Sequence, residues 1–364
     1  MSHPPGIDTP GVAGASSTGH DPVVIVGCGL AGWTVARELR QRDKARPITM
    51  VCADNGHFYA KPMLSNALAQ KKAAGHLIQK TAVQQAEALG VEVLANTRVG
   101  AIDRAARRLD MAAGAGHGAP LYYGKLVLAL GADAIRLPTP GLEHAHSVND
   151  IDDYHGFRDA LAAAGSAARV AIIGGGLIGS EFANDLAIGG YQVSVVDPAP
   201  WLIGNLVSQD NGEALKAALA GMGVDCYLGD LAESVERNAA GGYRIRLRSG
   251  TVLEADLILS AVGLRPRVEL AQQAGLDVAR GILVDEMGRT SDPDIYALGD
   301  CAAYASAARA DIADGAPRAL PYIMPIMTAG KAIAATLAGQ PTPIKFGPMP
   351  VRVKTPALPL TITG

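Results

Sequence analysis

Short apolar runs rich in β-branched residues alternate along the chain with longer segments of mixed polarity. The first run, Val23–Val26, is apolar at every position, which is typical of a parallel strand covered on both faces. A helix is predicted over residues 33–42, and a second apolar run follows at Ile48–Val51. This strand–helix–strand order predicts an α/β fold built on a parallel sheet.

The same pattern returns in the second half of the chain. Apolar runs at residues 170–173 and 193–196 enclose a predicted helix at residues 180–188. Two further pairs of segments match between the halves: 90–93 with 223–226, and 126–131 with 257–263. Each half therefore predicts a strand, helix, strand, helix and strand, followed by a small meander and a last buried strand.

Two features distinguish the halves. The first half is longer before its third strand, and residues 57–75 are the expected insertion, at an edge of the sheet where ligands bind. After the second half, a strand near Ile295–Ala297 and an apolar helix at Ile323–Leu337 are predicted. We therefore expect the second unit to be inserted in the first, with crossings near residues 138–141 and Leu264–Pro266.

A GxGxxG turn joins the first strand to its helix. The first glycine of this motif makes the turn, the second lets a pyrophosphate approach the backbone, and the third allows close helix–strand packing. Asp54 follows about 20 residues later, where it can accept a hydrogen bond from a ribose hydroxyl. The predicted nucleotide contacts in the motif are Gly27, Gly29, Leu30, Ala31 and Gly32.

The second half contains another such motif after its first strand. Its predicted nucleotide contacts are Gly174, Gly176, Leu177, Ile178 and Gly179. Asp197 ends the next strand, where it can accept a hydrogen bond from a ribose 2′-hydroxyl. NADP would need a cation there, yet residues 198–215 contain neither Lys nor Arg. The two motifs therefore predict two dinucleotides, and the second site favours NAD over NADP.

Composition narrows the classes of function. The chain has 364 residues and a formal net charge of −3, which excludes a polybasic nucleic-acid-binding protein. No apolar run is long enough for a transmembrane helix. The 4 cysteines form no CxxC pattern, so neither a metal site nor a dithiol motif is indicated.

The first twenty residues differ from the rest. More than half of residues 1–20 are Gly, Pro, Ser or Thr, and they lack the apolar and charged regions of a signal peptide. They are predicted to be a disordered tail, or a remnant of cloning. A cytoplasmic location is expected because no targeting segment is recognised.

The motifs, with residues 128–131, 261–266 and 295–300, resemble those of flavoprotein reductases of the pyridine nucleotide–disulfide oxidoreductase superfamily. Residues 59–65, 179–186 and 349–356 are similar to its rubredoxin–NAD⁺ reductase group. The resemblance covers residues 22–360 and implies an FAD-dependent NADH:rubredoxin oxidoreductase. Hydride would pass from NADH to flavin N5, and single electrons would then pass to rubredoxin.

The resemblance also implies a domain organisation. Two Rossmann-like, three-layer dinucleotide-binding domains are expected, with the NAD domain inserted in the FAD domain. The implied segments are an FAD-binding domain at residues 21–138 and 263–337, an NAD-binding domain at 139–262, and the start of a C-terminal domain at 338–364.

Roles for single residues follow from the resemblance by position. The first motif and Asp54 would hold FAD, and Asp300 would hold its ribityl chain. Lys61 and Lys354 would lie beside the isoalloxazine. The second motif and Asp197 would hold NADH, with Glu181 facing the nicotinamide. The other implied cofactor contacts are Pro62, Gly131, Gly263 and Gly299.

Plainer interpretations stand beside these roles. Lys61 and Lys354 could be solvated surface lysines, and Glu181 could be an acid favoured by the dipole at a helix N-terminus. Cys28 and Cys301 are interpreted as small buried residues. No side chain is expected to act as a catalytic acid or nucleophile, because the flavin carries the chemistry.

Two departures from the family pattern change the expected electron path. The family's redox-active cysteine pair is absent, and Lys61 stands where oxygen- and peroxide-reducing members keep one cysteine. Electrons are therefore expected to leave the flavin one at a time, to rubredoxin or a similar small iron–sulfur carrier. The chain also ends soon after residue 356, so only the start of the family's third domain is expected.

An acidic carrier such as a rubredoxin favours a basic docking face. Lys71 and Lys72 are one candidate, and a second candidate, or a solvated helix face, is the run Arg37, Arg40, Arg42, Lys44 and Arg46. A monomer without nucleic-acid partners is expected. Three other functions stay open: a reductase of a flavorubredoxin or an oxygenase ferredoxin, an NADH oxidase or quinone reductase, and a redox sensor or scaffold.

Overall fold

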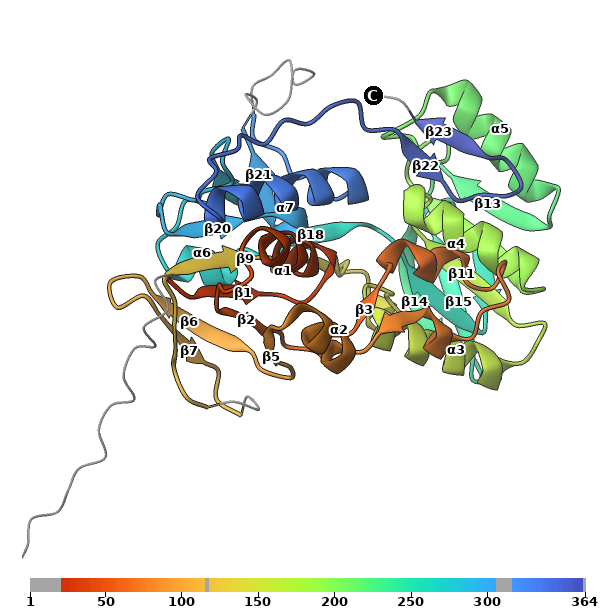
Figure 1. Cartoon of the computed structure of the whole chain (residues 1–364). Coiled ribbons are helices and arrows are strands. Elements are labelled where there is room, and N and C mark those ends of the chain that lie inside the picture. The colour runs from red at the N-terminus through yellow and green to blue at the C-terminus, as the bar shows by residue number, and fades with distance from the viewer. Residues whose placement is uncertain (1–20, 115–117, 306–315, 363–364) are drawn as a thin grey trace, which may run out of the picture.

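The computed structural model describes residues 21–114, 118–305 and 316–362. The tail predicted at residues 1–20 lies outside this part of the chain. Two parallel sheets organise the described residues, and each forms the centre of a separate unit (Figure 1). The predicted α/β architecture is confirmed.

The first unit is built on a five-stranded sheet with the order β20-β9-β1-β2-β5. All its pairings are parallel, with Val23 opposite both Ile48 and Lys125. Its strands are β1 (Val23–Val26), β2 (Ile48–Val51), β5 (Glu92–Leu94), β9 (Lys125–Leu128) and β20 (Ile295–Ala297). Because β20 comes from late in the chain, the chain returns to this sheet after it has built the second unit.

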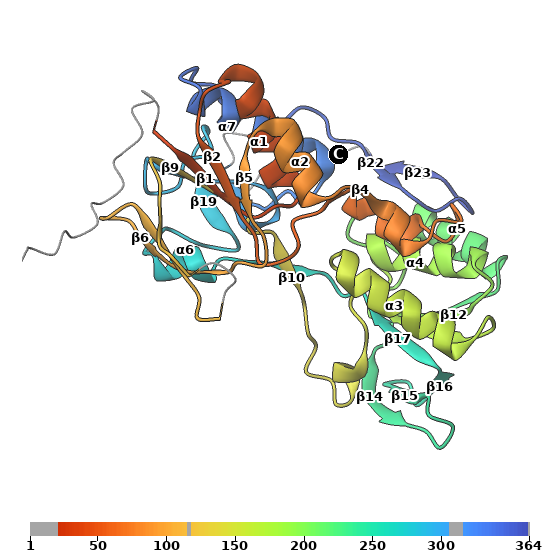
Figure 2. The same ribbon diagram turned by 60° about the horizontal axis from the view of Figure 1, so that its bottom comes forward.

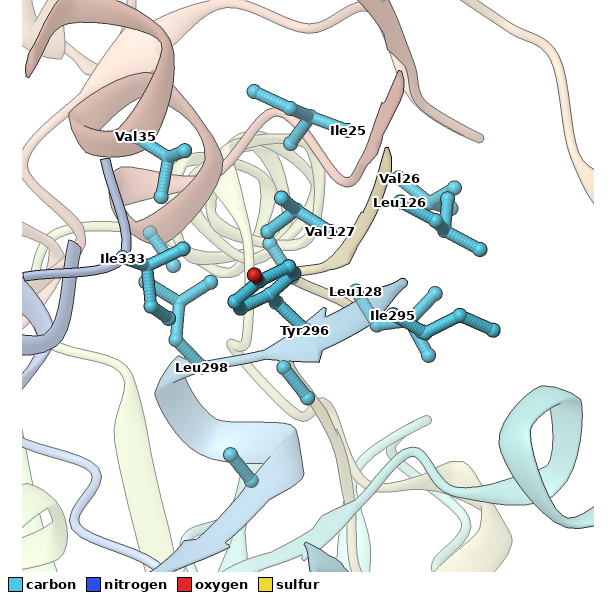
Figure 3. Close-up of a cluster of buried hydrophobic side chains, with 14 of the residues drawn as sticks. Ile25, Val26, Val35, Leu126, Val127, Leu128, Ile295, Tyr296, Leu298 and Ile333 are labelled. Carbon is cyan, nitrogen blue, oxygen red and sulfur yellow. The ribbon is translucent and has the colours of Figure 1, made fainter. Parts of the chain in front are cut away.

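Helices cover the first sheet and bury its apolar strands. Figure 3 shows Ile25, Val127 and Tyr296, from three of the strands, packed near Val35 and Ile333. Val35 belongs to α1 (Leu30–Arg42) and Ile333 to α7 (Ile323–Leu337), which has the predicted bounds. These contacts explain why the strand sequences are apolar at every position.

The second unit is built on a four-stranded sheet with the order β13-β12-β11-β17. Its pairings are also all parallel. The strands are β11 (Arg169–Ile173), β12 (Gln192–Asp197), β13 (Val224–Leu228) and β17 (Leu257–Ser260), and the helices are α3 (Ile151–Ala164), α4 (Leu177–Ile188) and α5 (Gln209–Ala220). The two units thus repeat one arrangement, which confirms the predicted duplication.

The helices after the two glycine motifs begin earlier than predicted. α1 starts at Leu30 instead of residue 33, and α4 starts at Leu177 instead of residue 180. Their N-caps, Gly29 and Gly176, have extended backbone and no side-chain cap. The last three residues of each motif therefore form the first helical turn. The sequence did not predict this turn, because glycine is a poor helix former.

Each unit carries an antiparallel meander, which precedes β9 in the first unit and β17 in the second. These meanders are β6 (Val99–Asp103), β7 (Arg108–Met111) and β8 (Leu121–Tyr122), and β14 (Ala232–Arg237), β15 (Tyr243–Leu247) and β16 (Val252–Ala255). The small elements of the first unit that remain are α6 (Glu269–Gln273), β19 (Ile282–Val284), η4 (Gly299–Cys301) and β21 (Ala302–Tyr304).

The predicted insertion lies between β2 and α2 (Ala82–Leu89). It contains β3 (Phe58–Tyr59), η1 (Lys61–Asn66), η2 (Ala74–Leu77) and β4 (Ile78–Lys80). The turn η1 packs against α3 and α4, and Leu64 and Leu77 join the apolar core of the second unit. The insertion therefore ties the first unit to the second.

Two connections run side by side between the units. β10 (Ala132–Ala134) pairs antiparallel with β18 (Leu264–Pro266), which is the second predicted crossing. The first connection begins at β10, earlier than the predicted crossing, and continues through η3 (Leu142–His144) (Figure 2).

A third link is made by the C-terminal segment. After α7 the chain passes to the second unit, where β22 (Val351–Val353) and β23 (Leu360–Ile362) form a ribbon near α4 and α5 (Figures 1 and 2). Backbone N–H groups of Lys354 and Ala357 donate to the side chains of Glu181 and Asn184 on α4. The segment is thereby fixed to the helix that follows the second glycine motif.

Candidate functional site

Both glycine motifs open onto one continuous cavity of about 1960 Å³. Pockets for one small ligand usually measure about 300–1,000 Å³, so this cavity has room for two large ligands. Of the predicted cofactor contacts it is lined by Gly27, Gly29, Leu30, Ala31, Asp54, Lys61, Pro62, Gly131, Gly174, Gly176, Leu177, Ile178, Glu181, Asp197, Gly263, Asp300 and Lys354. The predicted contacts Gly32, Gly179 and Gly299 are not part of its lining.

The glycines of the first motif have two different surroundings: some pack against the backbone, and one faces the cavity. A Cβ at Gly27 or Gly32 would overlap a backbone carbonyl oxygen, of Ala129 and of Gly27 respectively. A Cβ at Gly29 would meet no atom within 4 Å beyond its chain neighbours in the described part of the protein. Gly32 therefore serves helix–strand packing, and the bare backbone of Gly29 faces the cavity.

The second motif repeats this division. A Cβ at Gly174 would lie 2.6 Å from the carbonyl oxygen of Ala261, and one at Gly179 would overlap that of Gly174. Gly176 again faces open space among the described residues. Since neither Gly29 nor Gly176 caps its helix with a side chain, both helix N-termini offer free N–H groups to phosphates. The residues present fit two dinucleotides.

The two ribose-binding candidates differ in their surroundings. Asp54 is exposed, and its Oδ1 accepts from the N–H of Gly56 at 2.9 Å. Asp197 already accepts two backbone N–H groups, from Gly175 at 2.5 Å and from Ala199 at 2.7 Å. Asp197 thus braces its glycine motif, a role that the sequence did not predict, and its oxygens keep lone pairs for a ribose hydroxyl.

Lys61 and Asp300 bring opposite charges into the cavity wall. Burial lowers the pKa of Lys61 and raises the pKa of Asp300, and the attraction between the two charges opposes both shifts. The ammonium of Lys61 donates to Oδ1 of Asn149 at 2.6 Å. Lys61 is therefore not a solvated surface lysine.

Glu181 lies at the junction of three segments. Its side chain is 1% exposed, and its carboxylate pairs with the ammonium of Lys354. It also accepts from Oγ of Ser65 at 2.7 Å and from the N–H of Lys354 at 2.9 Å. Both Glu181 and Lys354 line the cavity, so neither is an ordinary surface charge. Lys61 and Lys354, both predicted to lie beside the isoalloxazine, therefore have separate partners, Asn149 and Glu181.

Several residues of the cavity wall were not predicted. Asn149 and Ser65 bind the charged groups described above, and Tyr59 accepts from the N–H of Ile151 at 3.1 Å. Arg267 donates to Oδ1 of Asp133 at 2.7 Å and to the carbonyl of Leu130 at 3.1 Å. Tyr59 and Ser65 belong to the family-like segment 59–65, whereas Asn149 and Arg267 had no sequence signal.

The two candidate docking segments differ in their contacts. Lys71 and Lys72 are exposed. In the other run, Arg40 donates to the carbonyls of Leu89 and Gly90, and Arg46 donates to that of Leu337. Arg42 and Arg37 lie near Glu38. The run from residue 37 to 46 therefore holds the backbone together and is less available to a partner.

The predicted buried cysteines are small core residues. Cys28 is 5% exposed and Cys301 is 0% exposed, and all 4 cysteines are free. Burial raises the pKa of Cys301 to about 11, which disfavours the reactive thiolate. Within the described part of the chain, no helix has the length and apolar character needed to cross a membrane.

The chain matches the family model described as "Pyridine nucleotide-disulphide oxidoreductase" over residues 21–331. The chain belongs to this family. It is 43% identical over 343 residues to a rubredoxin-NAD(+) reductase of Alcanivorax borkumensis, a match that covers 94% of this chain and 85% of the relative. It is also 35% identical to a nitric oxide reductase FlRd-NAD(+) reductase of Aeromonas hydrophila, with 94% and 83% covered.

Two solved structures of reductases share the fold of this chain. A ferredoxin reductase from Rhodopseudomonas palustris has a TM-score of 0.85 and 29% identity, and the match covers 95% of this chain and 82% of that one. A putidaredoxin reductase in covalent complex with putidaredoxin has a TM-score of 0.84 and 28% identity, with 94% and 81% covered.

Proposed function

We propose that this protein is an FAD-dependent NADH:rubredoxin oxidoreductase. The observation that carries the proposal is the single cavity onto which two uncapped helix N-termini open, one from each unit. Similarity to rubredoxin-NAD(+) reductases supports the choice of carrier. Bound FAD would supply a hydride acceptor at its N5 atom and a source of single electrons.

The first motif binds FAD in this proposal. The N-terminus of α1 and the backbone at Gly29 take up the pyrophosphate, and Asp54 accepts from the adenosine ribose. Asp300 binds the ribityl chain. Lys61 lies beside the isoalloxazine, where its positive charge stabilises the negative charge that the flavin gains on reduction.

The second motif binds NADH. The N-terminus of α4 takes up the pyrophosphate, and Asp197 accepts from the 2′-hydroxyl. The 2′-phosphate of NADPH would meet Asp197 and no cation from residues 198–215. Glu181 lies beside the nicotinamide and holds Lys354 near the flavin, so the buried pair orders the place where the two rings meet.

In this proposal electrons would pass from the bound flavin directly to a one-electron carrier. Since the cysteines are free, and Cys28, Cys52 and Cys301 are buried, no dithiol relay is proposed. A flavorubredoxin is the second candidate acceptor, because relatives named for it share 35% identity. Oxygen is disfavoured as an acceptor because, by the resemblance, Lys61 stands where oxygen-reducing members keep one cysteine.

We propose domain limits at residues 21–138, 139–262, 263–337 and 338–364. The limits at 138/139 and 262/263 lie close to the paired connections β10 and β18, and the limit at 337/338 follows the end of α7. One copy of the chain supplies both motifs, so a monomer suffices for the reaction. Free cysteines fit the reducing cytoplasm.

The proposal is tested by offering the purified holoprotein a panel of acceptors with NADH. Oxidised rubredoxin, flavorubredoxin, a ferredoxin, oxygen and a quinone are compared, each over a series of concentrations. The proposal expects the highest kcat/KM with rubredoxin. A high rate with oxygen or quinone alone would replace it with an oxidase or quinone reductase, and no turnover with any acceptor would favour a sensor.

A further inference from the structure

Asn149 connects three segments of the cavity wall through its own atoms. Its Oδ1 accepts from the ammonium of Lys61 at 2.6 Å, and its Nδ2 donates to the carbonyl of Ala132 in β10 at 2.9 Å. Its backbone N–H donates to Oδ2 of Asp153 in α3 at 2.9 Å. Asn149 thus joins the insertion, the connection between the units and the second unit.

We propose that Asn149 is the positioning residue for Lys61. It fixes the direction of the ammonium with a neutral acceptor and leaves the positive charge free to act on the isoalloxazine. This inference rests on the proposed function, which places Lys61 beside the flavin. Neither the motifs nor the family-like segments of the sequence include Asn149.

The orientation of the Asn149 amide is set by its two partners. A carbonyl oxygen, that of Ala132, can only accept, and the ammonium of Lys61 can only donate. The amide must therefore turn its NH₂ toward Ala132 and its oxygen toward Lys61. The opposite orientation would place the amide oxygen against the carbonyl oxygen of Ala132, and the amide NH₂ against the ammonium of Lys61.

A second contact fixes the backbone around this hydrogen bond. The hydroxyl oxygen of Tyr59 accepts from the N–H of Ile151 at 3.1 Å. Tyr59 lies two positions before Lys61, and Ile151 lies two positions after Asn149. The same two segments are therefore joined twice. The contact between Lys61 and Asn149 therefore does not depend on the long lysine side chain alone.

The ammonium of Lys61 lies among charged groups of both signs. Among the described residues, its ammonium makes one hydrogen bond, to Asn149, so two of its three N–H groups remain for a ligand. The charged groups that act most on it are Asp300 from η4, Asp150 at the N-cap of α3, Asp153 in the first turn of α3, and Arg267 from the segment after β18. Arg267 repels the ammonium, and the three carboxylates attract it.

A neutral acceptor suits this position better than the alternatives. An aspartate at residue 149 would add another negative charge in direct contact with the ammonium and would cancel its effect on the flavin. An alanine would remove the acceptor and leave a half-buried ammonium without its hydrogen bond and free to change rotamer. Asparagine supplies the hydrogen bond without the charge.

The test is a double-mutant cycle on the FAD-loaded protein, with the flavin midpoint potential as the readout. The variants are Asn149→Ala, Lys61→Met and the double variant. Asn149→Ala and Lys61→Met should each shift the potential to more negative values. In the Lys61→Met background, Asn149→Ala should have no further effect, because Asn149 acts through Lys61.

A fourth variant keeps the size of the side chain. Asn149→Asp should lower the equilibrium constant for flavin reduction about tenfold. For a two-electron couple this is a shift of the midpoint potential by about 30 mV to more negative values. It also provides the measurement if Asn149→Ala does not fold. Asn211→Ala and Asn211→Asp are matched controls, because Asn211 is exposed on α5 and outside the cavity lining. Tm and the Kd for FAD are measured for every variant.

The outcomes separate this inference from the proposed function. A shift on Asn149→Ala that persists in the Lys61→Met background, or no shift at all, overturns the inference and leaves the reductase proposal intact. An unchanged potential in Lys61→Met overturns both the inference and the placement of Lys61 beside the flavin. A protein whose flavin NADH does not reduce overturns the proposed function itself.

Discussion

Alanine at Gly29 and at Gly32 should separate cofactor binding from folding, because the two glycines face different surroundings. A methyl group at Gly32 would overlap the carbonyl oxygen of Gly27 and lie 3.3 Å from Cγ2 of Ile25. At Gly29 it would meet no heavy atom within 4 Å in the described part of the chain, apart from its sequence neighbours. Gly29 has a φ of −75° and a ψ of −172°, which alanine adopts without strain.

The expected magnitudes follow from these surroundings. Overpacking costs about 1–3 kcal/mol, and the better helix propensity of alanine offsets at most about 1 kcal/mol of that. Gly32→Ala apoprotein should therefore lose about 1–2 kcal/mol of unfolding free energy, whereas Gly29→Ala should lose none. FAD binding to Gly29→Ala should weaken by at least about tenfold, or 1.4 kcal/mol, because the methyl group fills the side that the pyrophosphate approaches.

The assay combines urea denaturation of the apoprotein with a fluorescence titration of FAD. Gly176→Ala and Gly179→Ala are the matched pair in the second unit, where NADH binding should fall and FAD binding should persist. The reasoning would be refuted if Gly29→Ala bound FAD as tightly as the parent protein. It would also be refuted if Gly29→Ala destabilised the apoprotein as much as Gly32→Ala.

Three further changes test the charged groups. Lys354→Met should cost about 3 kcal/mol in urea denaturation, because the carboxylate of Glu181, at 1% exposure, loses its cation, and Glu181→Gln should cost less; equal losses would contradict this order. Burial lowers the pKa of Lys61 below 10.5, so the charged form of Lys61 destabilises the folded protein at neutral pH. This loss of stability fades as pH rises from the lowered pKa toward 10.5. Lys61→Met apoprotein should therefore melt at a higher temperature than the parent at neutral pH, and a Tm difference that grows in alkali would speak against this. Charge reversal of Lys71 and Lys72 should slow rubredoxin reduction at low salt and leave ferricyanide reduction unchanged, whereas equal rubredoxin rates would exclude this docking face.

The periodic features of the fold were predictable because they are local. Apolar runs predicted most strands of both sheets, the match between the two halves predicted β5 and β13, and an apolar stretch predicted α7 with its observed bounds. The starts of α1 and α4 were missed by three residues, because a glycine-rich first turn has no helical signal of its own. In the proposed function, the phosphates of a bound dinucleotide would take the place of a capping side chain at this turn.

The contacts that organise the cavity were not predictable from local pattern. Lys61 and Asn149 are 88 residues apart in the sequence, and Glu181 and Lys354 are 173 residues apart. Resemblance identified Lys61, Glu181 and Lys354 as single residues, but it did not show which of them pair. Only the folded chain brings the insertion, the connection between the units and the C-terminal segment to one place.

The most direct test of the reductase function is an anaerobic absorbance titration of the purified holoprotein, first with NADH and then, on a fresh sample, with NADPH. The account predicts a yellow flavin that NADH bleaches in proportion to the amount added and that NADPH bleaches much less. Equal bleaching by NADPH would contradict the role assigned to Asp197. A protein without flavin, or a flavin that NADH leaves oxidised, would contradict the reductase function.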